Sequence, residues 1–492
     1  MTTVSSEPLV FRSARELAAR LASRELSAVE VMRAFLAQIE RVNSQVNAIV
    51  TLRPSAELLA EAAAADRKLA AGETVGPLHG LPIAIKDLSL TRGLRTTFGS
   101  TLYRNFVPAS DDLYVERVRR AGAIVIGKTN TPEFGAGSQT FNALFGATRN
   151  PYDTTKTCGG SSGGAAVALA CGMLPLADGT DLGGSLRNPA SYCNVVGFRP
   201  SPGRVPRLNV RATAMDGGSA ANAGSNLRRD TLGVHGPMAR SVDDLALLLS
   251  VMAGPDARDP LSLPEAGAAF RDVPERNFAG VRVAWSERLG RYPVEPAVTA
   301  ICNAARPMFA ALGCDVVDGE PDLGGVDELF QTLRAEGYAA ALRSDFERGR
   351  AQLKDTVAWN VEQGLKLTPA DLERAARAQA ALDARVAAFF AAHDFLVLPT
   401  VQLLPFPVEV EWPREIEGVA MHTYIDWMAT CYAISCLGSP ALSVPCGFSP
   451  GGLPVGLQIV GRRGRDADVL AIARAFEQAT NFARRHPPIG LP

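Results

Sequence analysis

The sequence predicts an α/β fold, a sheet core covered by helices, from three observations. Short apolar runs typical of buried strands recur along the chain, at residues 80–86, 123–126, 281–285, 395–400, 441–444 and 455–460. Longer segments with helical periodicity lie between them. The 492 residues, 47% of them hydrophobic, can bury a large core. No repeat or linker divides them, so we expect one domain over residues 1–492.

The N-terminal region, residues 12–72, is predicted to be helical. Ser13-x-x-Glu16 and Ser27-x-x-Glu30 are capping-box patterns, each followed by apolar residues at helical spacing. An alanine-rich helix is expected over about 55–71. These patterns indicate packing, and we assign no chemistry to them.

A lysine ends the first buried strand. Residues 80–87 read GLPIAIKD, which delivers Lys86 to the C-terminal edge of a strand, where α/β sites usually lie. For a single lysine in this position, a salt bridge to Asp87 or a solvated strand end is the commoner explanation.

The densest cluster of small residues is residues 157–187, TCGGSSGGAAVALACGMLPLADGTDLGGSLR. Two Gly/Ser groups, at 159–164 and 183–185, flank an apolar run at 165–177. Glycines expose backbone N–H donors, and a hydroxyl among such donors can combine a nucleophile with an oxyanion hole. The buried-looking run between the groups argues against a flexible linker.

These two groups resemble the signature of the amidase signature family of serine hydrolases. The resemblance covers residues 80–200 densely and 430–480 well. It implies a large mixed β-sheet covered on both faces by helices, with residues 80–200 as the signature core. The family's two key serines lie 24 positions apart, as do Ser161 and Ser185 (185 − 161 = 24). The family's catalytic lysine lies in a K-D segment like that of Lys86.

The resemblance implies a Ser–Ser–Lys triad that forms a covalent acyl-serine intermediate. Ser185 is the nucleophile, Lys86 is the base when neutral, and Ser161, preceded by a cis peptide bond, relays the proton between them. We expect the oxyanion donors to be the N–H groups of Leu182, Gly183, Gly184 and Ser185. We expect structural support from a second set: Ser162, Asp181 and Arg187.

The predicted substrate is a neutral aryl or alkyl amide. The candidate substrate-binding residues are Phe134, Gly135 and Cys158, and no charged pocket residue can be assigned from the sequence. A carbamate (urethane) or ester is the alternative, because it passes through the same tetrahedral intermediate. The long polar segment 205–235, within a variable body at 205–430, is expected to border the substrate entrance. Strands and a helix over 436–480 complete the chain.

Three other functions compete with this hypothesis. Residues 122–129 match the phosphate-loop pattern G-x-x-x-x-G-K-[ST], but their β-branched residues favour a buried strand. Residues 160–164 match G-x-S-x-G, which would make Ser162 the nucleophile of a Ser-His-Asp α/β-hydrolase, but no strand precedes them and the five histidines lie in no signature. A glutamine-amidotransferase subunit would need a glutamine-handling motif that residues 325–365 lack.

Composition limits the partners. A formal net charge of −1 gives no electrostatic case for nucleic acid or an anionic membrane. Eight cysteines without framework spacing indicate buried free thiols, and no secretory signal or membrane span is recognisable, so a cytoplasmic protein is predicted. We expect a small-molecule substrate, no cofactor, no metal, and a homodimer as a candidate assembly.

Overall fold

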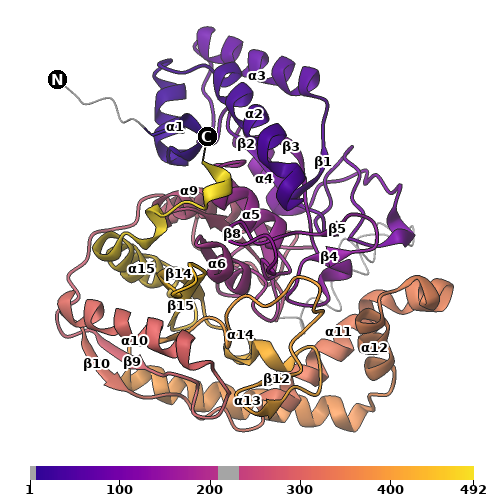
Figure 1. Ribbon diagram of the computed structural model, residues 1–492, viewed down its shortest axis with the longest axis vertical. Coiled ribbons are helices and arrows are strands. Elements are labelled where there is room, and N and C mark those ends of the chain that lie inside the picture. Colours follow the sequence, from indigo (N-terminus) through magenta and orange to yellow (C-terminus); the bar gives the residue numbers. More distant parts are fainter. Residues whose placement is uncertain (1–6, 209–231, 492) are drawn as a thin grey trace.

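An eight-stranded mixed sheet forms the centre of the computed structural model, which describes residues 7–208 and 232–491 (Figure 1). The strand order is β10-β9-β11-β15-β14-β7-β8-β6, with parallel and antiparallel neighbours. The strands are β6 (Leu176–Asp181), β7 (Val196–Arg199), β8 (Val234–Ala239), β9 (Arg282–Trp285), β10 (Asp315–Asp318), β11 (Phe395–Pro399), β14 (Ala441–Phe448) and β15 (Pro454–Gly461). The predicted α/β class is confirmed.

A second sheet has three strands in the order β1-β3-β2. They are β1 (Ile49–Leu52), β2 (Pro82–Lys86) and β3 (Ile124–Thr129), and β2 is parallel to β3. Lys128 lies inside β3 with its side chain fully buried. The phosphate-loop pattern at 122–129 is therefore a strand, as its β-branched residues predict. Two further pairs, β4 (Phe141–Asn142) with β5 (Gly146–Ala147) and β12 (Glu415–Ile416) with β13 (Val419–Ala420), are short.

Helices cover the large sheet on both faces. Gln458 of β15 contacts Arg187 at the start of α6, whereas its neighbours Leu457 and Ile459 point to the opposite face and belong to the hydrophobic core. Helices that pack on β14 or β15 include α6 (Arg187–Cys193), α10 (Pro296–Ala311) and α15 (Asp466–Thr480). Helix α5 (Gly163–Ala170) contacts the small sheet as well as β6 and β8 of the large one. Helix α9 (Val242–Met252) packs on β6, β7 and β8 of the large sheet and against α4 (Leu113–Arg120).

The N-terminal helices are α1 (Ala14–Ala22), α2 (Ala28–Val46) and α3 (Ser55–Ala70). Ser27 and Glu30 form the predicted capping box, and the Ser13 side chain accepts from the Glu16 N–H. The C-terminal end returns to these helices, where Gln38 donates to the Gly490 carbonyl (Figure 1).

Residues 326–392 form two long helices and one shorter helix. They are α11 (Val326–Gly349), α12 (Asp355–Leu365) and α13 (Pro369–Ala392), and α11 packs against both others. The sequence predicts helices over about 326–350 and 368–393, which match α11 and α13. It predicts neither α12 nor the buried α14 (Ala429–Cys436). The segment expected at the substrate entrance, 205–235, falls largely outside the described residues.

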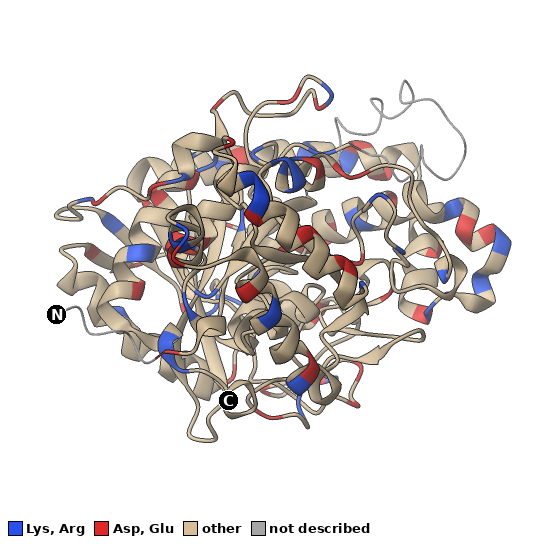
Figure 2. Ribbon diagram, turned by 90° about the horizontal axis from the view of Figure 1, so that it is seen from above, with Lys and Arg blue, Asp and Glu red and all other residues tan. Residues whose placement is uncertain are grey.

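Charged side chains of both signs are scattered over the ribbon (Figure 2), as the net charge of −1 suggests. All eight cysteines are buried free thiols, as predicted. Among the described residues, no helix is both long and apolar enough to cross a membrane.

Candidate active site

Lys86 lies where the two sheets meet. It is the last residue of β2, and its backbone N–H donates to Asp178 Oδ1 of β6, the edge strand of the large sheet, at 3.0 Å. Its side chain is fully buried. The predicted salt-bridge alternative with Asp87 does not form, because the Asp87 carboxylate accepts from Thr97.

Three hydroxyl groups surround the Lys86 amine. The Nζ donates to Ser161 Oγ (2.7 Å), Ser162 Oγ (2.8 Å) and Thr180 Oγ1 (2.8 Å). Burial lowers the pKa of Lys86 to about 7, and the carboxylates of Asp178 and Asp181 offset this only in part. The amine is therefore poised to exchange a proton near neutral pH.

The two glycine groups bring the two serines to one place. The Gly160–Ser161 peptide bond is cis, and the Ser162 N–H donates to the Ser185 carbonyl at 3.1 Å. At two glycines of this segment, Gly179 and Gly184, neighbouring atoms lie too close to leave room for a side chain. A Cβ on Gly179 would lie 2.5 Å from Ser162 Oγ. Gly184 has a φ of +113°, and a Cβ there would lie 2.5 Å from Cys431 Cβ.

Asp181 and Arg187, which we expect to give structural support, form a completely buried ion pair. Arg187 donates through Nε and Nη2 to the two carboxylate oxygens, at 3.1 and 2.8 Å. Although burial opposes ionisation, Arg187 and Arg199 hold the pKa of Asp181 below its usual range. The carboxylate also accepts from the Leu186 N–H, so the pair fixes the loop that carries Ser185.

One predicted oxyanion donor is already engaged. The Gly184 N–H donates to Asp181 Oδ1 at 3.0 Å, so we correct the prediction that included it. The N–H groups of Leu182, Gly183 and Ser185 have no acceptor among the described residues. These three remain candidates for binding a developing negative charge.

A cavity of about 320 Å³ opens above these groups. Ser161, Thr180 and Ser185 line it, together with Phe134 and Gly135 from the predicted binding segment. Cys158 does not line it: the side chain is fully buried, and Sγ donates to the carbonyls of Thr148 and Gly159. Cys158 is therefore dropped as a candidate substrate contact.

Comparisons with known proteins identify the family, since the family model described as Amidase matches residues 30–470. The chain belongs to the amidase signature family. It is 37% identical to an acylamidase of Rhodococcus erythropolis over 99% of both chains. It is 35% identical to a glutamyl-tRNA(Gln) amidotransferase subunit from Ralstonia nicotianae, over 96% of this chain and 98% of the relative.

A solved structure of a bacterial aryl acylamidase, described as an amidase signature enzyme, is similar throughout. It superimposes with a TM-score of 0.89 at 28% identity, and the match covers 99% of this chain and 100% of that chain. The predicted family and fold are confirmed. The chain is a hydrolase that acts on amide C–N bonds.

The α/β-hydrolase alternative does not fit this amidase. No strand runs directly into Ser162, which instead precedes α5, so the strand–turn–helix that a nucleophile elbow requires is absent from this described part of the chain. Ser162 Oγ is buried and bound by Lys86. Ser162 Oγ donates to the Thr180 carbonyl and accepts from Lys86 Nζ, so the candidate catalytic lysine is one of its hydrogen-bond partners.

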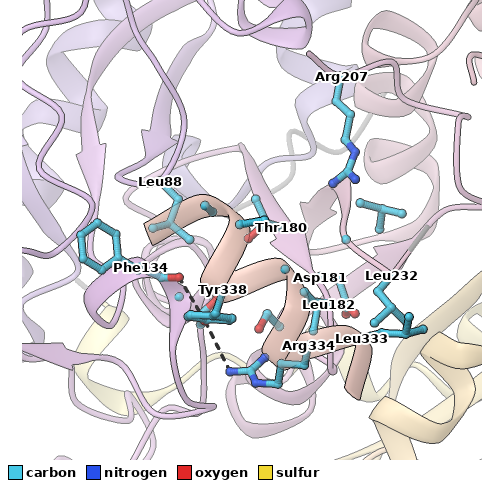
Figure 3. Close-up of a pocket in the computed structure, with 18 of the residues that line it drawn as sticks. Leu88, Phe134, Thr180, Asp181, Leu182, Arg207, Leu232, Leu333, Arg334 and Tyr338 are labelled. Atoms are coloured by element: carbon cyan, nitrogen blue, oxygen red, sulfur yellow. Dashed lines mark hydrogen bonds between the residues drawn. The ribbon is translucent and has the colours of Figure 1, made fainter. Parts of the chain in front are cut away.

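Charged residues that could not be assigned from the sequence line the amidase cavity. Arg334 of α11 is 5% exposed, and its side chain donates to Asn360 Oδ1 (3.2 Å) and to the hydroxyls of Tyr424 (2.5 Å) and Tyr338 (3.4 Å). The Tyr338 hydroxyl donates onward to the Phe134 carbonyl at 3.3 Å. Tyr338 thus lies between Phe134 and Arg334 on the cavity wall (Figure 3).

A histidine also lines the cavity. His235 of β8 pairs with Thr180 of β6, so the two side chains share a face of the sheet. Burial, with Arg207 and Lys86 nearby, lowers the pKa of His235 to about 3, and its Nδ1 has no hydrogen-bond partner in the described structure. No carboxylate orients this ring, so it lacks the partner that a Ser-His-Asp base requires.

Thr180, Arg334 and Tyr338 were missed from the sequence, whereas His235 lies in the segment 205–235 that was expected at the substrate entrance. Thr180 sits inside the recognised GTD segment and is a hydroxyl near the nucleophile, which is a usable signal. Arg334 and Tyr338 are far from the motif in sequence and reach the cavity only through α11.

Proposed function

We propose that the enzyme hydrolyses neutral aryl or alkyl amides through a covalent acyl group on Ser185. The observation that carries this proposal is the buried Lys86 amine, bonded to Ser161 Oγ at 2.7 Å beneath a cavity that Ser185 lines. The relative named an acylamidase and the neighbour named an aryl acylamidase support the amide substrate.

In the proposed acylation step, Ser185 Oγ attacks the amide carbonyl carbon while its proton passes through the Ser161 hydroxyl to the neutral Lys86 amine. The N–H groups of Leu182, Gly183 and Ser185 bind the oxyanion. The proton then returns along the same path to the leaving amine as the C–N bond breaks. Water, deprotonated by the same relay, releases the acid and restores Ser185.

The three hydroxyls explain how a neutral lysine stays aimed. A neutral amine has two N–H donors and one lone pair. Ser162 Oγ has the Thr180 carbonyl as an acceptor for its own proton, at 3.4 Å. We propose that Ser162 and Thr180 accept the two N–H groups, which leaves the lone pair directed at Ser161.

A panel of anilides, aliphatic amides and carbamates, assayed with wild type, tests the substrate class. We expect turnover of anilides or aliphatic amides, and loss of turnover in Lys86→Ala, Ser161→Ala and Ser185→Ala. Turnover of carbamates or esters alone would replace the amide substrate but keep the triad. If Ser162→Ala abolished activity while Lys86→Ala kept it, the triad itself would be wrong.

We also propose that the enzyme works without an amidotransferase partner, as one domain in the cytoplasm, with a homodimer as its candidate assembly. The missing glutamine-handling motif supports the first point. Amide turnover by the purified chain alone would show that no partner is needed. Light scattering measures the molar mass and so distinguishes a monomer from a homodimer.

A further inference from the structure

Helix α11 forms one side of the cavity, and a glycine lies in the middle of it. Gly337 falls inside this 24-residue helix, one turn after Leu333 and one turn before Ala341, and all three line the cavity. Apart from proline, glycine is the least favourable residue in a helix interior. A structural reason is therefore needed for its presence.

Packing supplies that reason for the neighbouring helix but not for α11. In α12, a Cβ on Gly364 would lie 2.1 Å from the Ala335 carbonyl oxygen, so the close approach of the two helices requires glycine there. Apart from its chain neighbours and the backbone of its own helix, a Cβ on Gly337 would meet no heavy atom of the described residues within 4 Å. Its φ is not in the left-handed region that favours glycine. Neither packing nor backbone conformation demands Gly337.

The missing side chain leaves room on the cavity side of the helix. Four apolar side chains of α11 line this wall, Leu333, Ala340, Ala341 and Leu342, together with the charged Arg334 and Glu336. Leu88 adds a further apolar side chain to the cavity lining. The Tyr338 ring stands next to Gly337 and is held at its hydroxyl by Phe134 and Arg334. The room beside Gly337 therefore suits an uncharged ring or alkyl chain.

We infer that Gly337 is a specificity-determining residue, which leaves space for the bulky apolar substituent of the substrate held at Ser185. This inference rests on the proposed nucleophile, Ser185. It assigns no chemical step to Gly337, which acts only by the volume that it leaves free.

Covalent labelling tests the inference without requiring the natural substrate. With a sulfonyl fluoride, an O–S bond forms at Ser185 Oγ, the S–F bond breaks and fluoride leaves, while the serine proton passes to the base. Methanesulfonyl fluoride is the small probe and phenylmethanesulfonyl fluoride the bulky one, and intact mass follows each rate. The test variant is Gly337→Leu. The control is Ser344→Leu, which places the same side chain on an exposed residue of the same helix that does not line the cavity.

In Gly337→Leu we expect labelling by the bulky probe to slow by about tenfold or more. Labelling by the small probe should stay within about twofold, and Ser344→Leu should match wild type with both probes. Equal slowing of both probes, or none, would overturn the inference while leaving Ser185 as nucleophile. Wild type that takes neither probe at Ser185 would instead overturn the proposed nucleophile, and the inference with it.

A thermal measurement separates the cavity role from a structural one. Gly337→Ala should raise the melting temperature, because alanine favours the helix and meets no neighbour. Gly364→Ala should lower it, because its Cβ collides with Ala335. A lower melting temperature for Gly337→Ala would show a structural glycine and contradict the inference.

Discussion

Two buried lysines lie on adjacent strands and have different surroundings. Lys86 ends β2, and Lys128 lies in β3, where it pairs with Ile85. The Nζ of Lys128 donates to the Ser89 carbonyl (2.6 Å) and to the hydroxyls of Thr91 (2.8 Å) and Thr96 (3.2 Å). Neither lysine lines the cavity itself, but two of the three hydroxyl partners of Lys86, Ser161 and Thr180, do. Lys128 has one carbonyl and two hydroxyl partners, and none of the three lines the cavity.

The partners decide what each lysine can do. A carbonyl oxygen only accepts, so Lys128 must keep an N–H directed at Ser89, whereas a hydroxyl can donate to an amine that has lost its proton. Burial lowers the pKa of both, to about 7 for Lys86 and to about 8 for Lys128, where Asp87 offsets more of the effect. Burial alone therefore does not identify which lysine is the base. The hydrogen-bond partners of each amine distinguish the two.

The largest expected effect separates the two lysines by activity. Lys86→Met should lower the acylation rate by about 10²- to 10⁴-fold, the usual contribution of a general base. Lys86→Arg should not restore it, because a guanidinium stays protonated. Stopped-flow acylation with an activated anilide measures both, and Lys128→Met is the matched buried-lysine control. Equal losses in Lys86→Met and Lys128→Met would show that neither lysine is special.

A second effect should appear in stability rather than rate. Lys128→Met leaves Thr91, Thr96 and the buried Asp87 without their cationic partner, so the free energy of unfolding should fall by about 1–3 kcal/mol. Lys86→Met should cost less, because a pKa of about 7 leaves more of the Lys86 amine neutral at neutral pH than the pKa of about 8 leaves of Lys128. Urea unfolding measures both, and a larger loss for Lys86→Met would reverse the comparison.

The smallest of these effects concerns the hydroxyls that hold Lys86. Ser162→Ala and Thr180→Val each remove one acceptor for a lysine N–H, so each should lower kcat by about tenfold, the effect of one net hydrogen bond. The KM of Ser162→Ala should change little, because Ser162 is buried and does not line the cavity. An unchanged kcat in both variants would remove the proposed role of these hydroxyls in aiming the amine.

Local signals in the sequence were sufficient for much of this fold and site. The capping box at Ser27, the apolar strand ending at Lys86 and the small residues around Ser161 and Ser185 depend on neighbours in sequence, so they are readable there. The same holds for the β-branched run that argued against a phosphate loop around Lys128.

What the sequence did not reveal depends on tertiary contacts. Helix α12 begins after Lys354, which provides no side-chain cap, so no start signal marks it. Helix α14 is buried all round and shows no amphipathic pattern. Arg334 reaches the cavity from α11, about 150 residues beyond Ser185, and only the packing of that helix reveals it.

The pH dependence of acylation tests the central claim most directly, that Lys86 acts as a neutral base. The neutral fraction of Lys86 increases as pH rises through its pKa, so the acylation rate of wild type should rise and level off with an apparent pKa of about 7. Lys128→Met should keep that profile and Lys86→Met should lose it. A profile that persists in Lys86→Met, or that moves with Lys128→Met, would contradict the account.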